Sequence, residues 1–195
     1  MERLDEARDG QVPVRTCLVT GQFVRAEPSS DVKVSAEPRN GGCPMTISAD
    51  MYYSIRSPYS FLAIQLLEQL LPQQDAEIVI NLRPVLPIAA RMPELFKRAN
   101  PMALPYLEHD CRRAAEKLGI EFRIWPQPDP IVQNMETLEI AQDQPHVRPL
   151  TRRMQYACEQ GKGYAYVLAL ATLLWDGNTD GWEQGDHLQS VAETV

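Results

Sequence analysis

Apolar and polar positions from residue 51 onward follow two periods, which predict a strand, a helix and a second strand. The short apolar run Met51–Ile55 is typical of a strand. The segment Ser57–Leu71 repeats apolar side chains at helical spacing and ends at Pro72, which cannot continue a helix. A nearly continuous apolar run at Ile78–Leu82 is typical of a buried parallel strand. The pattern therefore predicts a βαβ unit.

Beyond Pro93 the pattern is predominantly helical. Apolar side chains at helical spacing predict a helix over Ala103–Leu118, with Gly119 as its left-handed C-cap. The segment Glu121–Trp125 is predicted to be a short extended piece before a proline-rich loop at 126–130. Further helices are predicted over Ile131–Ala141, Arg148–Glu159, Tyr164–Trp175 and Asp186–Val195.

Residues 1–48 show no sustained period, and scattered Pro, Gly and Ser interrupt every short apolar run. We expect a disordered or loosely attached leader there, followed by the βαβ unit at 49–92 and a helical domain at 93–195. A stable sheet usually needs three or more strands, so the two predicted strands form an incomplete sheet. The strand Ile78–Leu82 would then have an open apolar edge, and we expect aggregation or a homodimer.

Composition and charge exclude several classes of protein. The 195-residue chain carries a net charge of −7 and no cluster of Lys and Arg, which is unlike a nucleic-acid-binding protein. Its apolar runs are all shorter than the roughly 18 residues of a membrane span. The N-terminus lacks the apolar core of a signal peptide. We therefore expect a cytoplasmic protein with no nucleic-acid or membrane partner.

The four cysteines indicate neither a redox pair nor a metal site. Cys17, Cys43, Cys111 and Cys158 form no Cys-x-x-Cys motif, and no His lies at ligand spacing from any of them. A structural disulfide is not expected in a reducing cytoplasm. We expect Cys111 and Cys158 to be small core residues on helices, as free cysteines usually are.

One acidic loop resembles a calcium site only in its first half. The segment Asp176–Gly181 has the spacing of an EF-hand loop, but its eighth position is Glu183 and its twelfth is His187. The twelfth position normally supplies a bidentate glutamate, which is the strongest ligand of that loop. The sequence therefore predicts an ordinary loop between helices and no metal site.

The strongest candidate for chemistry is Ser57, which lies between the first strand and the helix. Ser at the N-cap and Pro58 at the first helical position are a strong helix start. Unpaired N–H groups and the positive end of the helix dipole meet there, and they suit an anion such as a thiolate. A capping role alone also explains Ser57-Pro58, and the two interpretations do not exclude each other.

Several residues flank this point. Arg56 could pair with a ligand carboxylate or could be a solvent-exposed loop arginine. Arg83 and Pro84 follow the second strand, so in a parallel pair they lie at the same sheet edge as Ser57. The sequence predicts Ser57 as the catalytic residue, and the predicted cofactor-binding residues are Ser57, Pro58, Tyr59, Arg83 and Pro84.

The order of these residues along the chain resembles that of a known protein family. The run Ser57–Ala63 after a strand, followed by Arg83–Leu86, resembles the 2-hydroxychromene-2-carboxylate isomerases and the kappa-class glutathione transferases. The resemblance extends over roughly residues 51–193. Its further matches are Pro101–Tyr106, His109–Ala114, Leu118–Ile120, the loop at 126–130 and Leu174–Gly177.

The resemblance implies an α/β protein of the DsbA-like branch of the thioredoxin fold, with an inserted all-helical domain. It also implies glutathione as cofactor, with Ser57 facing the glutathione sulfur. The redox members of the fold hold Cys-x-x-Cys where this chain has Ser57–Ser60, so no dithiol chemistry is expected. The chain departs from the family at Ser54, where an acidic residue is usual, and at Leu104-Pro105, where a lysine is usual.

The function that the resemblance implies is glutathione-dependent isomerisation of a small-molecule substrate, of the 2-hydroxychromene-2-carboxylate type, in the degradation of aromatic compounds. One alternative is a kappa-like glutathione transferase, or a DsbA-family protein without the redox cysteines. The family's last loop, hairpin and helix have no counterpart before Val195. A truncated, non-catalytic helical binding module is therefore the remaining alternative.

Overall fold

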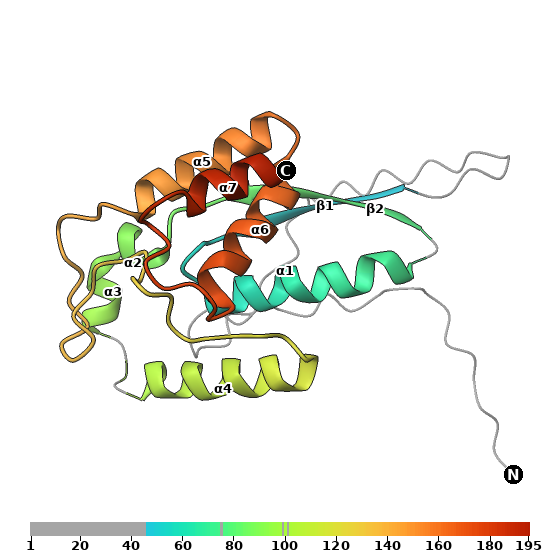
Figure 1. Ribbon diagram of the computed structural model, residues 1–195. Helices are drawn as coiled ribbons and strands as arrows, with labels where there is room; N and C mark the ends of the chain where they lie inside the picture. The colour runs from blue at the N-terminus through green and yellow to red at the C-terminus, as the bar shows by residue number, and fades with distance from the viewer. Residues whose placement is uncertain (1–45, 75, 99, 101) are drawn as a thin grey trace, which may run out of the picture. The chain divides into compact units, whose positions relative to one another are not determined.

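The computed structural model describes residues 46–195, except positions 75, 99 and 101 (Figure 1). The leader predicted at 1–48 lies outside the described residues, apart from its last three positions. Those three positions, 46–48, are the first residues of a strand that begins five residues earlier than predicted. The described residues belong to one compact unit.

The predicted βαβ unit is confirmed. Strand β1 (Thr46–Tyr53) and strand β2 (Glu77–Pro84) pair in parallel, with Met51 opposite Leu82 and Tyr53 opposite Pro84. Between them lie helix α1 (Pro58–Leu70) and the short 3-10 helix η1 (Leu71–Gln73). Pro72 falls in η1, where the α-helical pattern has ended, as a ring without an N–H requires.

The two faces of this small sheet differ in character. Side chains alternate along a strand, so residues on even positions of β1 lie on one face and those on odd positions on the other. The even face is polar and largely exposed, and pairs such as Thr46–Glu77 and Ser48–Asn81 hydrogen-bond across it. The odd face carries Tyr53 and, on β2, Leu82 into the hydrophobic core.

Most of the remaining regular structure is helical (Figure 1). Helices α5 and α6 pack against each other and against β2, while α1 contacts both α4 and α6. The sequence predicted α4 with the bounds it has, and predicted α5, α6 and α7 to within one or two residues. The bounds are α2 Ile88–Arg91, α3 Pro93–Lys97, α4 Ala103–Leu118, α5 Val147–Glu159, α6 Gly163–Trp175 and α7 His187–Thr194.

The helix predicted over Ile131–Ala141 is wrong. This segment is irregular, and Gln133 and Ile140 form an antiparallel bridge within it. The side chain of Asn134 accepts hydrogen bonds from two following backbone N–H groups, those of Glu136 and Thr137. An asparagine that binds its own backbone in this way competes with helix formation. The apolar residues that predicted a helix are therefore side chains of a packed loop.

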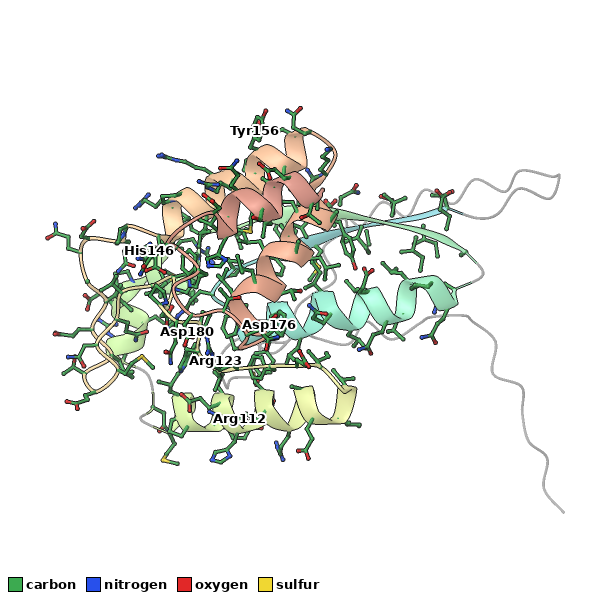
Figure 2. All side chains as sticks on the ribbon, in the orientation of Figure 1. Arg112, Arg123, His146, Tyr156, Asp176 and Asp180 are labelled. Carbon is green, nitrogen blue, oxygen red and sulfur yellow. The ribbon has the colours of Figure 1, made fainter. Side chains whose placement is uncertain are left out.

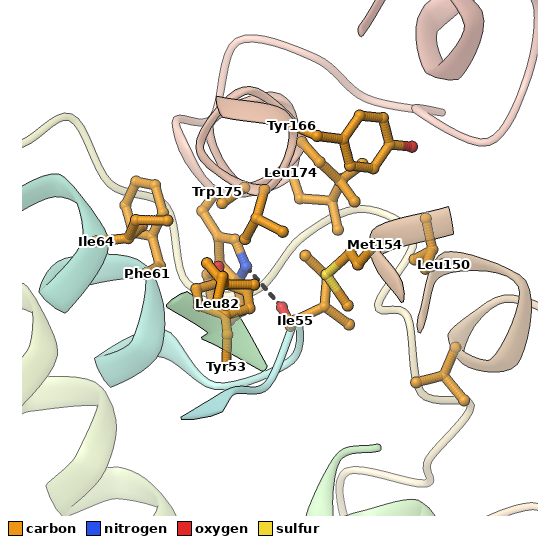
Figure 3. Packing of buried hydrophobic residues seen from close by; sticks show 14 of the residues in the cluster. Tyr53, Ile55, Phe61, Ile64, Leu82, Leu150, Met154, Tyr166, Leu174 and Trp175 are labelled. Atoms are coloured by element: carbon orange, nitrogen blue, oxygen red, sulfur yellow. Dashed lines mark hydrogen bonds between the residues drawn. The ribbon is translucent and has the colours of Figure 1, made fainter. Parts of the chain in front are cut away.

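An aromatic stack links the βαβ unit to the later segments. The rings of Phe61, Phe122 and Trp175 stack on one another with centroids 5.9–6.1 Å apart. The Trp175 indole N–H donates to the carbonyl of Ile55 at 3.0 Å (Figure 3). Both residues are fully buried. Helix α6 is thereby tied to the segment that leads from β1 into α1.

Candidate functional site

Ser57 is the N-cap of α1, as the sequence predicted. Its backbone is extended, and its hydroxyl oxygen accepts a hydrogen bond from the Ser60 N–H at 3.3 Å. The Ser57 N–H donates to the carbonyl of Ser54 at 3.0 Å, which closes a tight turn between strand and helix. Pro58 follows at the first helical position and is buried. The hydroxyl thus lies at the positive end of a 13-residue helix.

Arg83 and Pro84 end β2 at the same edge of the sheet at which Ser57 follows β1. The register places Arg83 opposite Tyr52 and Pro84 opposite Tyr53. The Arg83 guanidinium is more than half exposed and lies 3.4 Å from a carboxylate oxygen of Asp50. That pair lies on the polar face of the sheet, so the Arg83 side chain extends back along the strands rather than toward Ser57.

Arg56 is neither a solvent-exposed loop residue nor free for a ligand. Only 6% of its side chain is exposed. Its guanidinium donates to both carboxylate oxygens of Asp129 at 2.9–3.2 Å and to the Gln133 side-chain oxygen at 2.7 Å. It also lies over the Trp125 ring, 4.6 Å from the centroid. The residue before Ser57 is therefore fixed by the segment between α4 and α5.

Trp125 extends this cluster toward α4. Its indole N–H donates to a carboxylate oxygen of Glu108 at 2.9 Å, and its ring packs against Trp175. The sequence did not identify Trp125, Asp129 or Gln133 as partners of Arg56, the residue before Ser57. The proline-rich loop at 126–130 was the only local signal, since a rigid loop can hold such side chains in place.

Tyr59 lies one residue into α1 and is 41% exposed. Its hydroxyl donates to Asp110 on α4 at 2.8 Å, and Arg113 donates to the same carboxylate at 2.7 Å. Burial, followed by the bond to Asp110, raises the pKa of the Tyr59 hydroxyl above its usual range. The hydroxyl therefore stays protonated, and its hydrogen bond is donated to Asp110.

The neighbouring thiols are not poised for nucleophilic chemistry. Cys111 is fully buried on α4, and burial raises the pKa of its thiol to about 12. Cys158 on α5 is partly buried, and its sulfur donates to the carbonyl of Leu82 at 3.3 Å. Burial also raises the pKa of the Cys158 thiol. The predicted core role is confirmed for Cys111, while Cys158 lies at the border of the core.

The loop at 176–180 surrounds the guanidinium cation of Arg123. The Arg123 guanidinium reaches the carbonyls of Gly177 and Thr179 at 3.3 and 3.5 Å, and it pairs with Asp180 at 2.7 Å. Figure 2 shows Arg123, Asp176 and Asp180 together at this loop. Within the described ranges, no group of acidic, His or Cys side chains has an arrangement that could hold a metal ion.

Two surface hollows lie away from Ser57. One, of about 160 Å³, is lined by residues of the α5 and α7 region that include His146, Arg153 and Trp182. The other, of about 360 Å³, lies between the α2–α3 segment and the start of α5 and includes Glu94 and Arg148. Neither includes a predicted site residue. In the part of the chain that the structure describes, no helix is long and apolar enough to cross a membrane.

Comparison with known proteins gives a family. No curated protein matches the chain. A solved structure of 2-hydroxychromene-2-carboxylate isomerase is similar to it, with 21% sequence identity and a TM-score of 0.48. That similarity covers 76% of this chain and 65% of the isomerase. The family model of the DSBA-like thioredoxin domain matches residues 49–195, which include every described element except the start of β1. The chain therefore belongs to the DSBA-like thioredoxin domain family, as the sequence resemblance over residues 51–193 had implied.

Proposed function

We propose that this protein is a glutathione-dependent isomerase of the 2-hydroxychromene-2-carboxylate type. The observation that carries the proposal is the position of the Ser57 hydroxyl, at the N-cap of α1 and at the carboxyl end of β1. The sequence resemblance to these isomerases adds the expectation that this serine faces the glutathione sulfur. The family itself does not specify the reaction, because one fold supports many activities.

The hydroxyl of Ser57 is arranged to donate to a thiolate. Its oxygen accepts the Ser60 N–H, and among the described residues no acceptor takes its own hydrogen. A donor held at the positive end of a helix favours the ionised form of a thiol, which lowers the thiol pKa. Hydrogen bonds to charged groups contribute about 1.5–3 kcal/mol, more than bonds between neutral groups.

Bound glutathione would supply a nucleophilic thiolate for reversible addition to an unsaturated carbon, which is the chemistry that isomerisation about a double bond needs. The protein's part is to hold that sulfur. Ser57 provides the hydrogen bond, and the buried contacts of Arg56 with Asp129 and Trp125 fix the turn that presents it. The protein itself contributes no thiol here, because Ser57 and Ser60 stand at the two positions where the redox members of the fold have cysteines.

The test is glutathione binding to the 195-residue chain and to Ser57→Gly. Glycine at the N-cap costs only a few tenths of a kcal/mol, so stability should hardly change. We expect the affinity for glutathione to fall by roughly tenfold or more and the pKa of the bound thiol to rise, because a charge-assisted bond is lost. Calorimetric titration gives the affinity, and the ultraviolet absorbance of the thiolate gives the pKa.

Two further variants sharpen this test. Ser57→Asp keeps an effective N-cap but places a negative charge beside the sulfur, so the protein should stay folded and lose binding. Ser54→Gly makes the same chemical change three residues earlier in the turn and should bind as the parent does. If Ser57→Gly binds and ionises glutathione like the parent, Ser57 is only a helix cap and the proposal fails.

A further inference from the structure

The proline-rich loop at 126–130 is held by donors from a distant part of the chain. Three of its five residues are prolines, which have no N–H, so the loop has few donors for its own carbonyl groups. The Gly181 N–H donates to the carbonyl of Gln127 at 2.8 Å, and the Trp182 indole N–H donates to the carbonyl of Pro128 at 2.7 Å. The segment between α6 and α7 therefore fixes the centre of this loop.

Asp129 follows Pro128 and carries this constraint to Arg56. The carbonyl of Pro128 and the N atom of Asp129 belong to one planar peptide unit, so the Trp182 bond fixes the plane from which Asp129 extends. The Asp129 carboxylate accepts hydrogen bonds from the Arg56 guanidinium at 2.9–3.2 Å. Arg56 directly precedes Ser57 in the chain. A path of hydrogen bonds and covalent bonds therefore runs from Trp182 to Ser57.

Trp182 itself lies apart from Ser57. Its side chain is 1% exposed, and its ring and the His146 ring meet edge to face with centroids 5.4 Å apart. Both residues line the hollow near α5 and α7, which includes no predicted site residue. A buried donor without an acceptor is unfavourable, so the indole N–H keeps its bond to the Pro128 carbonyl. The hydrogen-bonded route from Trp182 to Ser57 passes through the loop at 126–130.

We propose that Trp182 is a positioning residue of the Ser57 site. Its bond to Pro128 holds Asp129 where that carboxylate accepts the donors of Arg56, and Arg56 in turn fixes the turn that ends at Ser57. Hydrogen bonds weaken steeply as their angle departs from linearity, so a site depends on the contacts that support it. The inference rests on the proposed function for its glutathione readout, and the hold on Arg56 has a readout of its own.

The first test measures the hold on Arg56 without glutathione. Trp182→Phe removes the indole N–H and keeps an aromatic ring in the core. In nuclear magnetic resonance spectra of the full chain, the Arg56 Nε–H should exchange slowly with solvent, because it is buried and bonded to Asp129. Its signal is identified by its absence from Arg56→Lys. We expect faster exchange in Trp182→Phe. Equal exchange in the parent and Trp182→Phe overturns the proposal.

The second test measures glutathione binding to the parent and to Trp182→Phe. We expect the variant to bind several-fold more weakly and the pKa of the bound thiol to rise, because the Ser57 hydroxyl is no longer held in position. If the parent binds glutathione and Trp182→Phe binds and ionises it equally, Trp182 is only structural and the proposal fails. If the parent does not bind glutathione, the proposed function fails, and the exchange of the Arg56 Nε–H alone decides whether Trp182 holds Arg56.

Two control variants separate loss of position from loss of stability. Tyr164→Phe removes a hydroxyl that bonds Glu68 at 3.2 Å, so it deletes an aromatic donor away from the loop and should behave as the parent does. Val191→Ala leaves a space beside a buried position of α7, which should lower the melting temperature and leave both readouts unchanged. If Val191→Ala shifts both readouts as far as Trp182→Phe does, the effect is general loosening of the fold, which contradicts the proposal.

The route through Asp129 has its own test. Asp129→Asn keeps the size of the side chain and removes its charge, which weakens the bond to Arg56. If Trp182 acts through Asp129, adding Trp182→Phe to Asp129→Asn should produce no further change in the exchange of the Arg56 Nε–H. Additive effects of the two changes would show that Trp182 does not act through Asp129, and they would overturn the proposed route.

Discussion

At the scale of single residues, the ion pair of Arg56 and Asp129 determines how Ser57 is presented. A charge with 6% exposure must be paired, since an isolated buried charge is strongly unfavourable. Asp129, Gln133 and the face of Trp125 together satisfy the guanidinium. Removing one partner of such a pair destabilises the fold by more than the intact pair stabilises it, because the other charge then remains buried without a partner.

We expect Asp129→Ala to lower the free energy of unfolding by about 3–5 kcal/mol, because it leaves the Arg56 charge buried and unpaired. The control is Asp50→Ala, which breaks the exposed pair with Arg83 and should cost less than about 1 kcal/mol. Urea denaturation followed by circular dichroism measures both. Equal losses in the two variants would show that the Arg56 pair is not buried in solution.

A second residue-scale prediction concerns acid stability. The hydrogen bond from Tyr59, helped by Arg113, lowers the pKa of Asp110 below its usual range. A carboxylate with a lowered folded-state pKa stabilises the fold above its unfolded-state pKa, and that contribution is lost as pH falls through the folded-state pKa. The Tyr59→Phe variant should therefore lose less stability than the parent as the pH falls below about 4.

Denaturation midpoints across the acid range test this prediction. Tyr106→Phe is the control, because Tyr106 lies on α4 with 65% of its surface exposed. It should keep the pH profile of the parent. An unchanged profile in Tyr59→Phe would mean that the hydrogen bond between Tyr59 and Asp110 does not form in solution.

At the scale of elements, one arginine connects the segment after α4 to the end of α6. The Arg123 N–H donates to the carbonyl of Trp175, and its side chain fills the loop that follows. Gly177 has a φ of 85°, and a Cβ there would lie 3.0 Å from the Cβ of Arg123. The loop can thus close around the guanidinium only with glycine at this position.

We expect Arg123→Met to lower the free energy of unfolding by about 1–3 kcal/mol, because loop carbonyls lose their donor. Arg112→Met, on the exposed surface of α4, should change it by less than about 0.5 kcal/mol. Added calcium should leave the melting temperature of the parent unchanged, because the loop already encloses a cation. Thermal denaturation with and without calcium measures all three. Stabilisation of the parent by calcium would contradict this account of the loop.

At the scale of the whole molecule, one hydrophobic core joins the βαβ unit to the later helices. Trp175 on α6, Phe61 on α1 and Phe122 in the irregular segment share a single stack. Trp182 is buried in the same core, and its indole N–H donates to the carbonyl of Pro128. A small sheet of two strands is thus stabilised by helices on one face, while the polar face remains exposed.

Because the core is continuous, residues 46–195 should unfold in one transition. Tryptophan fluorescence and far-ultraviolet circular dichroism should give the same midpoint. Separate transitions by the two probes would show that the helical segments fold independently of the βαβ unit.

The sequence by itself determined the elements whose signals are local. Helix α1 follows from Ser57 and Pro58, whose cap geometry needs only the next turn, and Gly119 ends α4 in the left-handed conformation that the sequence predicted. The parallel pairing of the strands followed from the order strand, helix, strand. The burial predicted for Ile78–Leu82 was wrong for most of the strand, because only Leu82 of β2 is buried and the other face of the sheet is polar and exposed. The confirmed features depend on neighbours within a few residues or on the order of the elements.

The tertiary structure alone decided which side chains hold Arg56, the residue before Ser57. Arg56 finds Asp129 and Gln133 more than seventy residues later in the chain, and no local pattern encodes that contact. The closure of the 176–180 loop on Arg123 is likewise set by packing between distant segments. In residues 131–141, by contrast, the hydrogen bonds of Asn134 to the backbone just after it compete with the helix that the apolar spacing predicted. Contacts between distant segments form only when the core brings the segments together, so periodicity and spacing, which report each segment's own preference, could not predict them.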